Sequence, residues 1–329
     1  MARSLIVRSE SWPIKGSFRI SRGAKTEAEV VVVEISENGI TGRGEGDPYP
    51  RYGEAVQSVV GQIETLRSEI ANGLTRQDLQ QRLPAGAARN ALDCALIDLE
   101  AKASGRPAHA ILNLPPPRPQ RTAFTLSLGT PEAMGAAAKA AADRSFSLLK
   151  LKVGGADDLA RVEAVRNAAP QVRLIADANE GWAPDELFRL APELARLGVA
   201  LLEQPLKAGD DEALRNYRSP VPLCADESCH TRADLPRILG RYSHINVKLD
   251  KTGGLTEAAA LIQEAATQGL RLMVGCMVST SLAMAPAMLL TNGADFVDLD
   301  GPLLLLRDRE PGVVYDRDMI LPPTRALWG

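Results

Sequence analysis

Three carboxylates fall at equivalent points of a repeating pattern and could hold a metal ion. Asp177, Glu203 and Asp226 each end a short apolar run, and they are spaced 26 and 23 residues apart. An ionised side chain is costly among buried apolar residues unless it is paired or binds a metal. Carboxylate oxygens without histidine are hard ligands, which suit Mg²⁺, with Mn²⁺ as an alternative. The pattern therefore predicts a divalent-cation site at these three residues.

Three lysines interrupt similar apolar runs and could act as acids and bases. Lys150 and Lys152 lie two residues apart in the run LLKLKV, so in a strand both project to one face. Lys248 interrupts the later run HINVKL. Crowding by positive charge would depress a lysine pKa and make a neutral amine base accessible. A divalent cation would stabilise the charge that develops when a proton is removed next to a carboxylate.

Eight apolar runs in the second part of the chain would position these residues. Neighbouring runs begin about 22 to 28 residues apart, the size of one strand–helix unit, and helical stretches such as 255–269 lie between them. Eight near-equal units predict a closed parallel barrel, whose active site lies at the carboxyl ends of the strands. An open doubly wound sheet is the alternative. The predicted strands are 123–128, 148–153, 172–177, 200–204, 222–227, 244–249, 271–276 and 296–300.

The first part of the chain is different and is predicted to be α+β. Residues 29–35 form a strand, Asn38-Gly39 is a hairpin signal, and 40–46 is the returning strand. Apolar residues at helical spacing predict helices over 51–71 and 87–103. The proline-rich stretch 114–119 then breaks structure. These features predict a first domain over 1–118 and a barrel domain over 119–302. We also expect the segment 303–329 to complete the first domain.

Composition excludes several classes of function. The net charge is −3 and aromatic residues make up 4% of the chain, which disfavours nucleic-acid binding. Three isolated histidines disfavour a histidine-built zinc site, and four scattered cysteines without a C-x-x-C motif favour the reducing cytoplasm. The start MARSLIVRSE is no signal peptide. Residues 272–290 carry no charge, but their glycine, hydroxyl residues and proline indicate a strand and a buried helix, with no membrane contact.

Taken together, these motifs resemble the enolase superfamily in its muconate-lactonizing branch. The resemblance covers nearly the whole chain and implies an α/β fold, a modified (β/α)₇β TIM-type barrel with an N-terminal α+β capping domain. Within the branch, the chain is most similar to the dipeptide epimerases, and among them to those that act on L-Ala-D/L-Glu. The matching segments are Lys150-Leu151-Lys152, Asp177-Ala178-Asn179, Glu203-Gln204-Pro205, Ala225-Asp226-Glu227-Ser228 and Asn246-Val247-Lys248.

The resemblance implies a Mg²⁺-dependent two-base reaction on the C-terminal residue of a dipeptide, in murein peptide metabolism. Lys152 would remove the α-proton, an enediolate would form, and Lys248 would return a proton to the opposite face. Lys150 would help to neutralise the substrate carboxylate. The remaining substrate contacts implied are Asp298 and Asp300 for the α-ammonium group, Arg22 for an acidic side chain, and Thr125 and Cys276 in the lining.

Other reactions of the same branch are the main alternatives. They are N-succinylamino-acid racemase, o-succinylbenzoate synthase and cycloisomerase, or an epimerase for another dipeptide. A substrate without an amine would leave Asp298 and Asp300 unpaired, which disfavours the first three. A non-catalytic barrel that binds an ion or a small anion is an alternative from a different class. The sequence leaves open whether the chain forms homo-oligomers.

Overall fold

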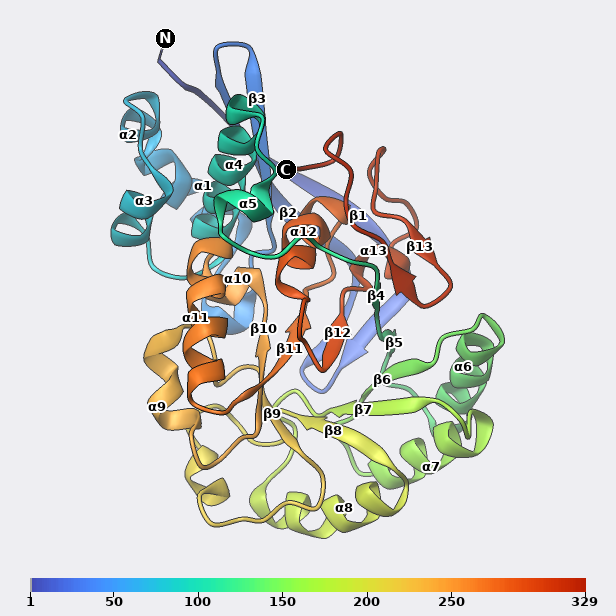
Figure 1. Cartoon of the computed structure of the whole chain (residues 1–329). Helices are drawn as coiled ribbons and strands as arrows, with labels where there is room; N and C mark the ends of the chain where they lie inside the picture. Colours follow the sequence, from blue (N-terminus) through green and yellow to red (C-terminus); the bar gives the residue numbers. More distant parts are fainter. Residues whose placement is uncertain (1) are drawn as a thin grey trace.

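The computed structural model describes residues 2–329 and begins with a three-stranded antiparallel sheet (Figure 1). The predicted Asn-Gly turn is confirmed, because Asn38 and Gly39 have φ angles of 52° and 80°, as a type I′ hairpin requires. The first strand is not evident from the sequence, since only Leu5 and Ile14 of its 17 residues are buried apolar side chains. The strands, in spatial order, are β1 (Ser4–Ile20), β2 (Gly23–Glu37) and β3 (Ile40–Gly46).

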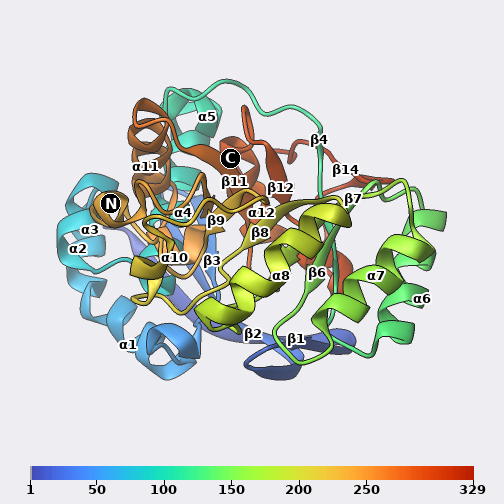
Figure 2. The same cartoon turned by 90° about the horizontal axis from the view of Figure 1, so that it is seen from below.

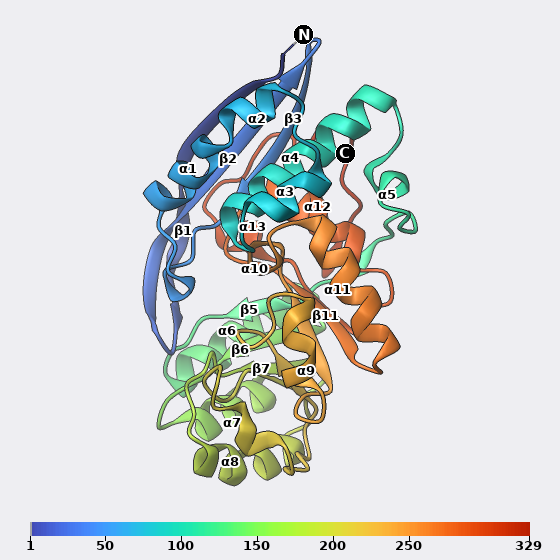
Figure 3. The ribbon, with the colours of Figure 1, turned by 90° about the vertical axis from the view of Figure 1, so that its left-hand side faces the viewer.

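Helices cover one face of this sheet (Figure 3). The predicted single helix over 51–71 is wrong, because Gly53 ends a short 3₁₀ turn with φ 76° and Leu66 leaves the helical region with ψ 2°. The observed elements are η1 (Pro50–Tyr52), α1 (Val56–Thr65), α2 (Arg67–Ala71), α3 (Arg76–Arg82) and α4 (Ala87–Ser104). We refer to β1–β3, η1 and α1–α4 as the capping region.

Three glycines allow α4 to lie directly on β3. A Cβ atom at Gly42, Gly44 or Gly46 would lie 2.2, 2.0 or 2.4 Å from a backbone oxygen of α4. The three positions alternate along the strand and therefore share one face. The close approach leaves no room for side chains there, and the sheet and the helix pack as one layer pair.

The second part of the chain forms a parallel eight-stranded sheet in strict sequence order (Figures 1 and 2). A backbone hydrogen bond of 2.8 Å from Ala123 to Val297 joins the start of the first strand to the eighth. The sequential order confirms the predicted barrel and excludes a doubly wound sheet, and all eight predicted strands are present. They are β5 (Phe124–Leu126), β6 (Leu148–Lys152), β7 (Arg173–Asp177), β8 (Val199–Glu203), β9 (Leu223–Ala225), β10 (His244–Val247), β11 (Arg271–Gly275) and β12 (Phe296–Asp298).

The connections between these strands are mostly helical. The link between β8 and β9 contains only a 3₁₀ turn, so the barrel has fewer α-helical crossovers than an ideal one. None of the helices in residues 2–329 is long and apolar enough to span a bilayer. The helical elements are α5 (Ala108–Ile111), α6 (Pro131–Asp143), α7 (Asp158–Ala168), α8 (Pro184–Arg196), η2 (Asp211–Leu214), η3 (Arg232–Asp234), α9 (Leu235–Ile238), α10 (Leu249–Thr252), α11 (Leu255–Thr267), α12 (Ser281–Ala287), η4 (Met288–Leu290) and α13 (Gly301–Leu304).

An apolar layer closes the amino-terminal end of the barrel. Seven strands each contribute one buried residue: Ala123, Leu148, Ile175, Leu201, Cys224, Met273 and Phe296. Because strand side chains alternate, the residue two positions further along each strand also faces the interior. Those next residues are Thr125, Lys150, Asp177, Glu203, Asp226, Gly275 and Asp298. In the barrel interior, an apolar layer is therefore followed directly by a layer of mostly charged side chains.

The C-terminal segment returns to the capping region (Figure 3). Its short strands β13 (Tyr315–Asp316) and β14 (Met319–Ile320) pair with each other, and β14 also pairs with β4 (Gln120–Arg121). Arg309 contacts Glu45 of β3 at 2.6 Å, and the Trp328 indole donates to the Arg43 carbonyl at 3.0 Å. These contacts support our proposal that residues 303–329 complete a domain formed by 1–118, with 119–302 as the barrel domain.

Candidate active site

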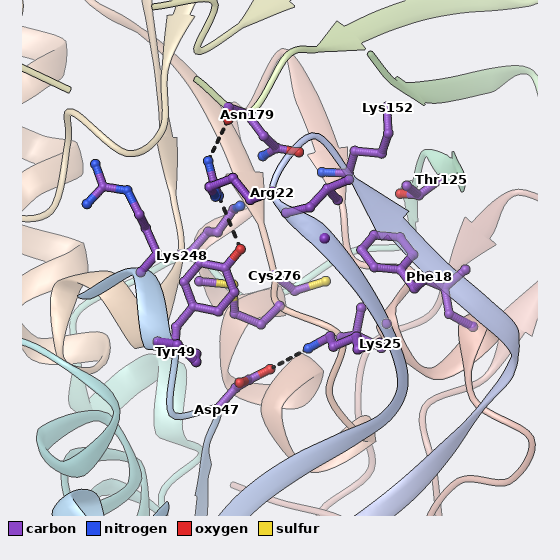
Figure 4. Close-up of a pocket in the computed structure, with 18 of the residues that line it drawn as sticks. Phe18, Arg22, Lys25, Asp47, Tyr49, Thr125, Lys152, Asn179, Lys248 and Cys276 are labelled. Atoms are coloured by element: carbon purple, nitrogen blue, oxygen red, sulfur yellow. Dashed lines mark hydrogen bonds and ion pairs between the residues drawn. The ribbon is translucent and has the colours of Figure 1, made fainter. Parts of the chain in front are cut away.

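A cavity of about 800 Å³ lies where the capping region meets the carboxyl ends of the barrel strands (Figure 4). The tip of the β1–β2 hairpin forms part of its wall, since Phe18, Ile20 and Arg22 line it. Every predicted catalytic and substrate-contact residue lines this cavity: Arg22, Thr125, Lys150, Lys152, Lys248, Cys276, Asp298 and Asp300. Of the predicted metal ligands, Asp226 lines it, and Asp177 and Glu203 are completely buried.

The strand register brings the acids and lysines together. Lys152 pairs with Asp177 across β6 and β7, and Asp177 pairs with Glu203 across β7 and β8. Asp226 follows β9 on the next strand. Lys152 donates to Asp177 at 2.6 Å, and Lys150 lies 2.8 Å from Glu203. Parallel pairing thus converts residues far apart in sequence into one buried cluster.

The three predicted metal ligands have the donor chemistry of a Mg²⁺ site, but they are arranged here as ion pairs. Within residues 2–329, no three Asp, Glu, His or Cys side chains are placed to ligate one ion. Glu203 Oε2 and Asp226 Oδ1 are buried and accept no hydrogen bond from these residues, although Lys150 and Lys251 lie at ion-pair distance. These oxygens and the all-carboxylate donor set fit Mg²⁺, which Asp177, Glu203 and Asp226 would hold.

Neighbouring carboxylates set the charge balance around Lys150 and Lys248. Burial lowers the pKa of Lys248, but Asp226, whose Oδ2 lies 2.7 Å away, acts together with Glu203 and Asp177 and raises that pKa above its ordinary value. The pKa of Lys150 is raised in the same way by Asp298 and Glu203. The Lys150 and Lys248 ammonium groups therefore do not show the predicted depression of a lysine pKa, because carboxylates lie next to both of them. Conversely, burial raises the pKa of Glu203 to about 7.

Lys251 is a central residue of the site that sequence reasoning missed. Its side chain is fully buried and donates to the carbonyl oxygens of Asp226, Cys229 and Asn246 at 2.5, 2.9 and 2.9 Å. Its ammonium also lies 2.5 Å from Asp226 Oδ1. It therefore holds the backbone of the loop that contains the predicted ligand Asp226 against strand β10. Its position three residues after Lys248 was the available signal, but a lysine in a short helix resembles a surface residue.

Asn246 fixes the orientation of Glu203 and depends on a glycine to do so. Its amide donates to Glu203 Oε1 at 2.8 Å. A Cβ atom at Gly275 of the neighbouring strand would lie 2.6 Å from the Asn246 side chain. The glycine therefore provides the space in which the Asn246 amide reaches the carboxylate.

We expect Gly275→Ala to displace Asn246 and to disturb Glu203. Overpacking of this kind lowers the free energy of unfolding by about 1–3 kcal/mol, and Mg²⁺ binding should weaken with it. Thermal unfolding and calorimetric Mg²⁺ titration measure the two effects. Gly61→Ala is the control, because Gly61 lies in α1 with no atom within 4 Å of an added Cβ. It should stabilise the helix by about 0.5–1 kcal/mol. Unchanged Mg²⁺ affinity in Gly275→Ala would refute the proposed role of Asn246.

The loops that follow β7 and β8 hold their polar groups in strained conformations. Asn179, Glu180 and Gln204 have φ angles of 44°, 66° and 35°, which non-glycine residues seldom adopt. The Gln204 side-chain oxygen accepts from the backbone of Asp226 at 2.8 Å and of Ser228 at 3.1 Å. The strain is thus retained where the backbone must turn sharply beside the acidic cluster.

Asp298 and Asp300 already have partners within the chain. Asp298 accepts from Lys150 at 2.9 Å and from the Thr125 hydroxyl at 3.3 Å. Asp300 accepts from the Thr125 amide at 2.6 Å. Burial, with a smaller contribution from Asp298, raises the pKa of Asp300 to about 7. Cys276 lies on the same wall, and burial raises the pKa of its thiol (Figure 4).

The predicted substrate contact Arg22 lies in the turn between β1 and β2, and its guanidinium group donates hydrogen bonds to four acceptors (Figure 4). Its guanidinium donates to Glu227 at 2.7 Å and to Glu180 at 3.0 Å. It also donates to the Asn179 carbonyl at 2.6 Å and the Tyr49 hydroxyl at 3.1 Å. Arg22 therefore links the capping region to the loops after β7 and β9.

A parallel barrel that places buried carboxylates between lysines at the carboxyl ends of its strands defines a class of enzymes that move protons next to a carboxylate, assisted by a divalent cation. Two family models match this chain. The mandelate racemase/muconate lactonizing enzyme N-terminal domain matches residues 2–113, and the enolase C-terminal domain-like family matches residues 133–325. The chain belongs to the mandelate racemase/muconate lactonizing enzyme family, which confirms the predicted enolase-superfamily resemblance.

Two proteins with similar sequences are named as an epimerase and a racemase. L-Ala-D/L-Glu epimerase of Escherichia coli K12 is 49% identical over 313 residues, which cover 95% of this chain and 98% of the relative. N-acetyl-D-glutamate racemase of a Pseudoalteromonas species is 47% identical over 305 residues, covering 91% and 95%. The predicted resemblance to dipeptide epimerases is thereby confirmed.

Solved structures of relatives have the same fold. An enolase family member from Agrobacterium tumefaciens, with homology to dipeptide epimerases and with sodium and L-Ala-L-Glu bound, is 50% identical, with a TM-score of 0.97. The match covers 99% of this chain and all of that one. A dipeptide epimerase from Enterococcus faecalis V583, complexed with Mg and L-Leu-L-Tyr, is 30% identical, with a TM-score of 0.91 and 98% of each chain covered.

Proposed function

We propose that this protein epimerises the C-terminal residue of the dipeptide L-Ala-D/L-Glu: one lysine removes the α-proton, and a second lysine donates a proton to the opposite face. The observation that carries the proposal is the placement of Lys152 and Lys248 in one cavity, each bonded to a different carboxylate of the acidic cluster. The similarity to L-Ala-D/L-Glu epimerase supports the same activity. We further propose a cytoplasmic location and a role in murein peptide metabolism.

The acidic cluster would hold the cofactor. Asp177, Glu203 and Asp226 would bind Mg²⁺, or Mn²⁺ in its place. The positive charge of the bound ion would make the C–H bond next to the substrate carboxylate more acidic. Lys150 would neutralise part of the same carboxylate, since its ammonium group lies beside the acidic cluster and lines the cavity. Both roles lower the energy of the carbanionic state through preorganised charge.

The two lysines would exchange a proton with the α-carbon from opposite faces. Lys152 takes the proton from one face as a base, and Lys248 donates a proton to the other as an acid. The roles are reversed for the opposite epimer. Each lysine has a carboxylate partner, Asp177 or Asp226, that stabilises its ammonium form after it has accepted a proton.

Lys25 is better placed than Arg22 to receive the acidic side chain of a glutamyl substrate. Arg22 already has four acceptors, two of them carboxylates. Within the described part of the chain, the Lys25 ammonium has a single loose partner, Asp47 Oδ2 at 3.6 Å. Its side chain is 34% exposed on the cavity wall (Figure 4). An ammonium group has three donors, so Lys25 can contact Asp47 and a substrate carboxylate together.

We expect Lys25→Met to change selectivity between an acidic and a neutral side chain. The ratio of kcat/KM for L-Ala-L-Glu to that for L-Ala-L-Gln should fall about 10- to 100-fold, because a desolvated charge pair is lost. Chiral chromatography of both products gives the ratio. Arg22→Met is the matched comparison. If the ratio falls in that variant alone, Arg22 binds the side chain and the assignment to Lys25 fails.

Racemisation of N-acetylglutamate is a second candidate, favoured by one observation. Asp298 and Asp300 are hydrogen-bonded to Lys150 and Thr125 without any substrate amine, so an amide in place of the amine leaves neither acid unpaired. The similarity to N-acetyl-D-glutamate racemase supports this candidate. Polarimetry with N-acetyl-D-glutamate measures the activity directly.

Proton NMR in D₂O tests the main proposal. With Mg²⁺ and L-Ala-L-Glu, the glutamyl α-proton signal should disappear while the L,D diastereomer appears, and EDTA should stop both changes. Exchange without a second diastereomer would show that only one lysine acts on this substrate. Absence of both changes would exclude the dipeptide and leave N-acetylglutamate as the substrate to examine.

A further inference from the structure

Glu180 is a buried carboxylate that accepts hydrogen bonds from two arginines, which lie in separate parts of the capping region. It lies in the loop after β7 and is 6% exposed. Arg51 of η1 contacts it with two parallel hydrogen bonds of 2.6 and 2.7 Å. Arg22 of the β1–β2 turn contributes a third of 3.0 Å, and the amide of Ala208 a fourth of 2.8 Å. Both carboxylate oxygens are thereby engaged, in the bidentate geometry that makes arginine–carboxylate pairs strong.

The β1–β2 turn is seated on the barrel at the same place. The Ser21 hydroxyl donates to the Asn179 carbonyl at 3.0 Å. Two glycines form the seat, because a Cβ atom at Gly154 or Gly181 would lie 2.6 or 3.2 Å from the Ser21 Cβ. The turn can approach the loops after β6 and β7 only because both positions lack a side chain.

The second capping segment is joined to the first at this point. Tyr49, which precedes η1, accepts a hydrogen bond from Arg22, and Arg51 shares Glu180 with Arg22. Arg22, Tyr49 and Arg51 line the cavity, whereas Glu180 lies behind them and does not line it. Any influence of Glu180 on the reaction must therefore act through these neighbours.

We propose that Glu180 is a positioning residue that fastens capping segments 20–25 and 48–53 to the barrel and so closes the cavity over its substrate. Its left-handed backbone, with φ 66°, is a cost that the surrounding contacts offset, as at other functional turns. Closure of the mouth excludes water and fixes the cavity wall around the substrate. The activity readout below rests on the proposed epimerase function, whereas the exchange readout does not.

Glu180→Gln tests the proposal with two measurements. Hydrogen–deuterium exchange in segments 20–25 and 48–53 should become about 10-fold faster or more, while exchange in α4 stays the same. The kcat/KM for L-Ala-L-Glu should fall about 10- to 100-fold, mainly through a higher KM, because the substrate must then order the mouth itself. A lower melting temperature with unchanged exchange and unchanged KM would show a merely structural role and overturn the proposal.

A double-mutant cycle with Arg51→Gln adds a test that a general loss of stability does not mimic. If Glu180 acts through Arg51, the Arg51→Gln effect on KM should largely disappear in the Glu180→Gln background. Additive effects would overturn the proposal. Glu257→Gln is the matched control, since Glu257 forms a similar fork with Arg232, at 3.2 and 3.0 Å, far from the cavity lining. It should leave KM and exchange in both segments unchanged.

The two proposals fail in distinguishable ways. If the wild-type protein does not turn over L-Ala-L-Glu, the proposed function fails, and hydrogen exchange still decides the role of Glu180. If the wild-type protein is active and Glu180→Gln changes neither exchange nor KM, the positioning role fails alone.

Discussion

Replacement of Lys152 or Lys248 by alanine should abolish epimerisation while leaving proton exchange at one epimer. Each lysine reaches one face of the α-carbon in the proposed reaction, so the lysine that remains can still exchange the α-proton that faces it. The rate of inversion should fall by about 10²- to 10⁴-fold or more in each variant. Proton NMR in D₂O, started separately from L-Ala-L-Glu and L-Ala-D-Glu, measures both processes.

The stereochemical outcome is the sharpest part of this prediction. The two variants should exchange opposite epimers, and neither should interconvert them. Glu193→Gln is a suitable control, because Glu193 forms an exposed ion pair with Arg196 on the barrel surface. Wild-type inversion in either alanine variant would contradict the two-base assignment. Exchange of the same epimer by both variants would place the two lysines on one face.

Removal of one acidic ligand should have an effect of similar size. We expect Glu203→Gln to lower Mg²⁺ affinity by about 100-fold or more and to lower turnover with it, since a neutral amide replaces one of three anionic donors. Gln preserves the shape of the side chain and its contact with Asn246. Calorimetric Mg²⁺ titration measures the affinity, and epimerisation at several Mg²⁺ concentrations measures the dependence.

The wild-type protein provides the complementary experiment. EDTA should abolish epimerisation, and added Mg²⁺ should restore it, with Mn²⁺ as an alternative. Asp47→Asn is a matched control, because Asp47 is also a buried acid on the cavity wall but lies outside the proposed ligand set. It should not reduce Mg²⁺ affinity. Full activity in EDTA would contradict the role proposed for Asp177, Glu203 and Asp226.

The sequence by itself determined the barrel strands and most of the residues that line the cavity at their carboxyl ends. Eight apolar runs at near-equal spacing specify eight parallel strands, because each run must be buried and each intervening helix must cover it. Charged residues in such runs are conspicuous, since burial of a charge is too costly to be incidental. Strand periodicity then places Lys150 and Lys152 on one face, and the structure has both in the cavity.

Only the tertiary structure decided how the capping region meets these residues. Glu180 and Arg51 are 129 positions apart, and Arg22 and Glu227 are 205 apart, so no local period relates them. Strand β1 also lacked a signal, because its burial depends on β2 and on the C-terminal segment. The raised pKa values of Lys150 and Lys248 were decided in the same way, since a pKa depends on distances to acids on other strands. Local sequence fixes periodicity and charge, whereas burial and pairing depend on contacts that exist only after the chain has folded.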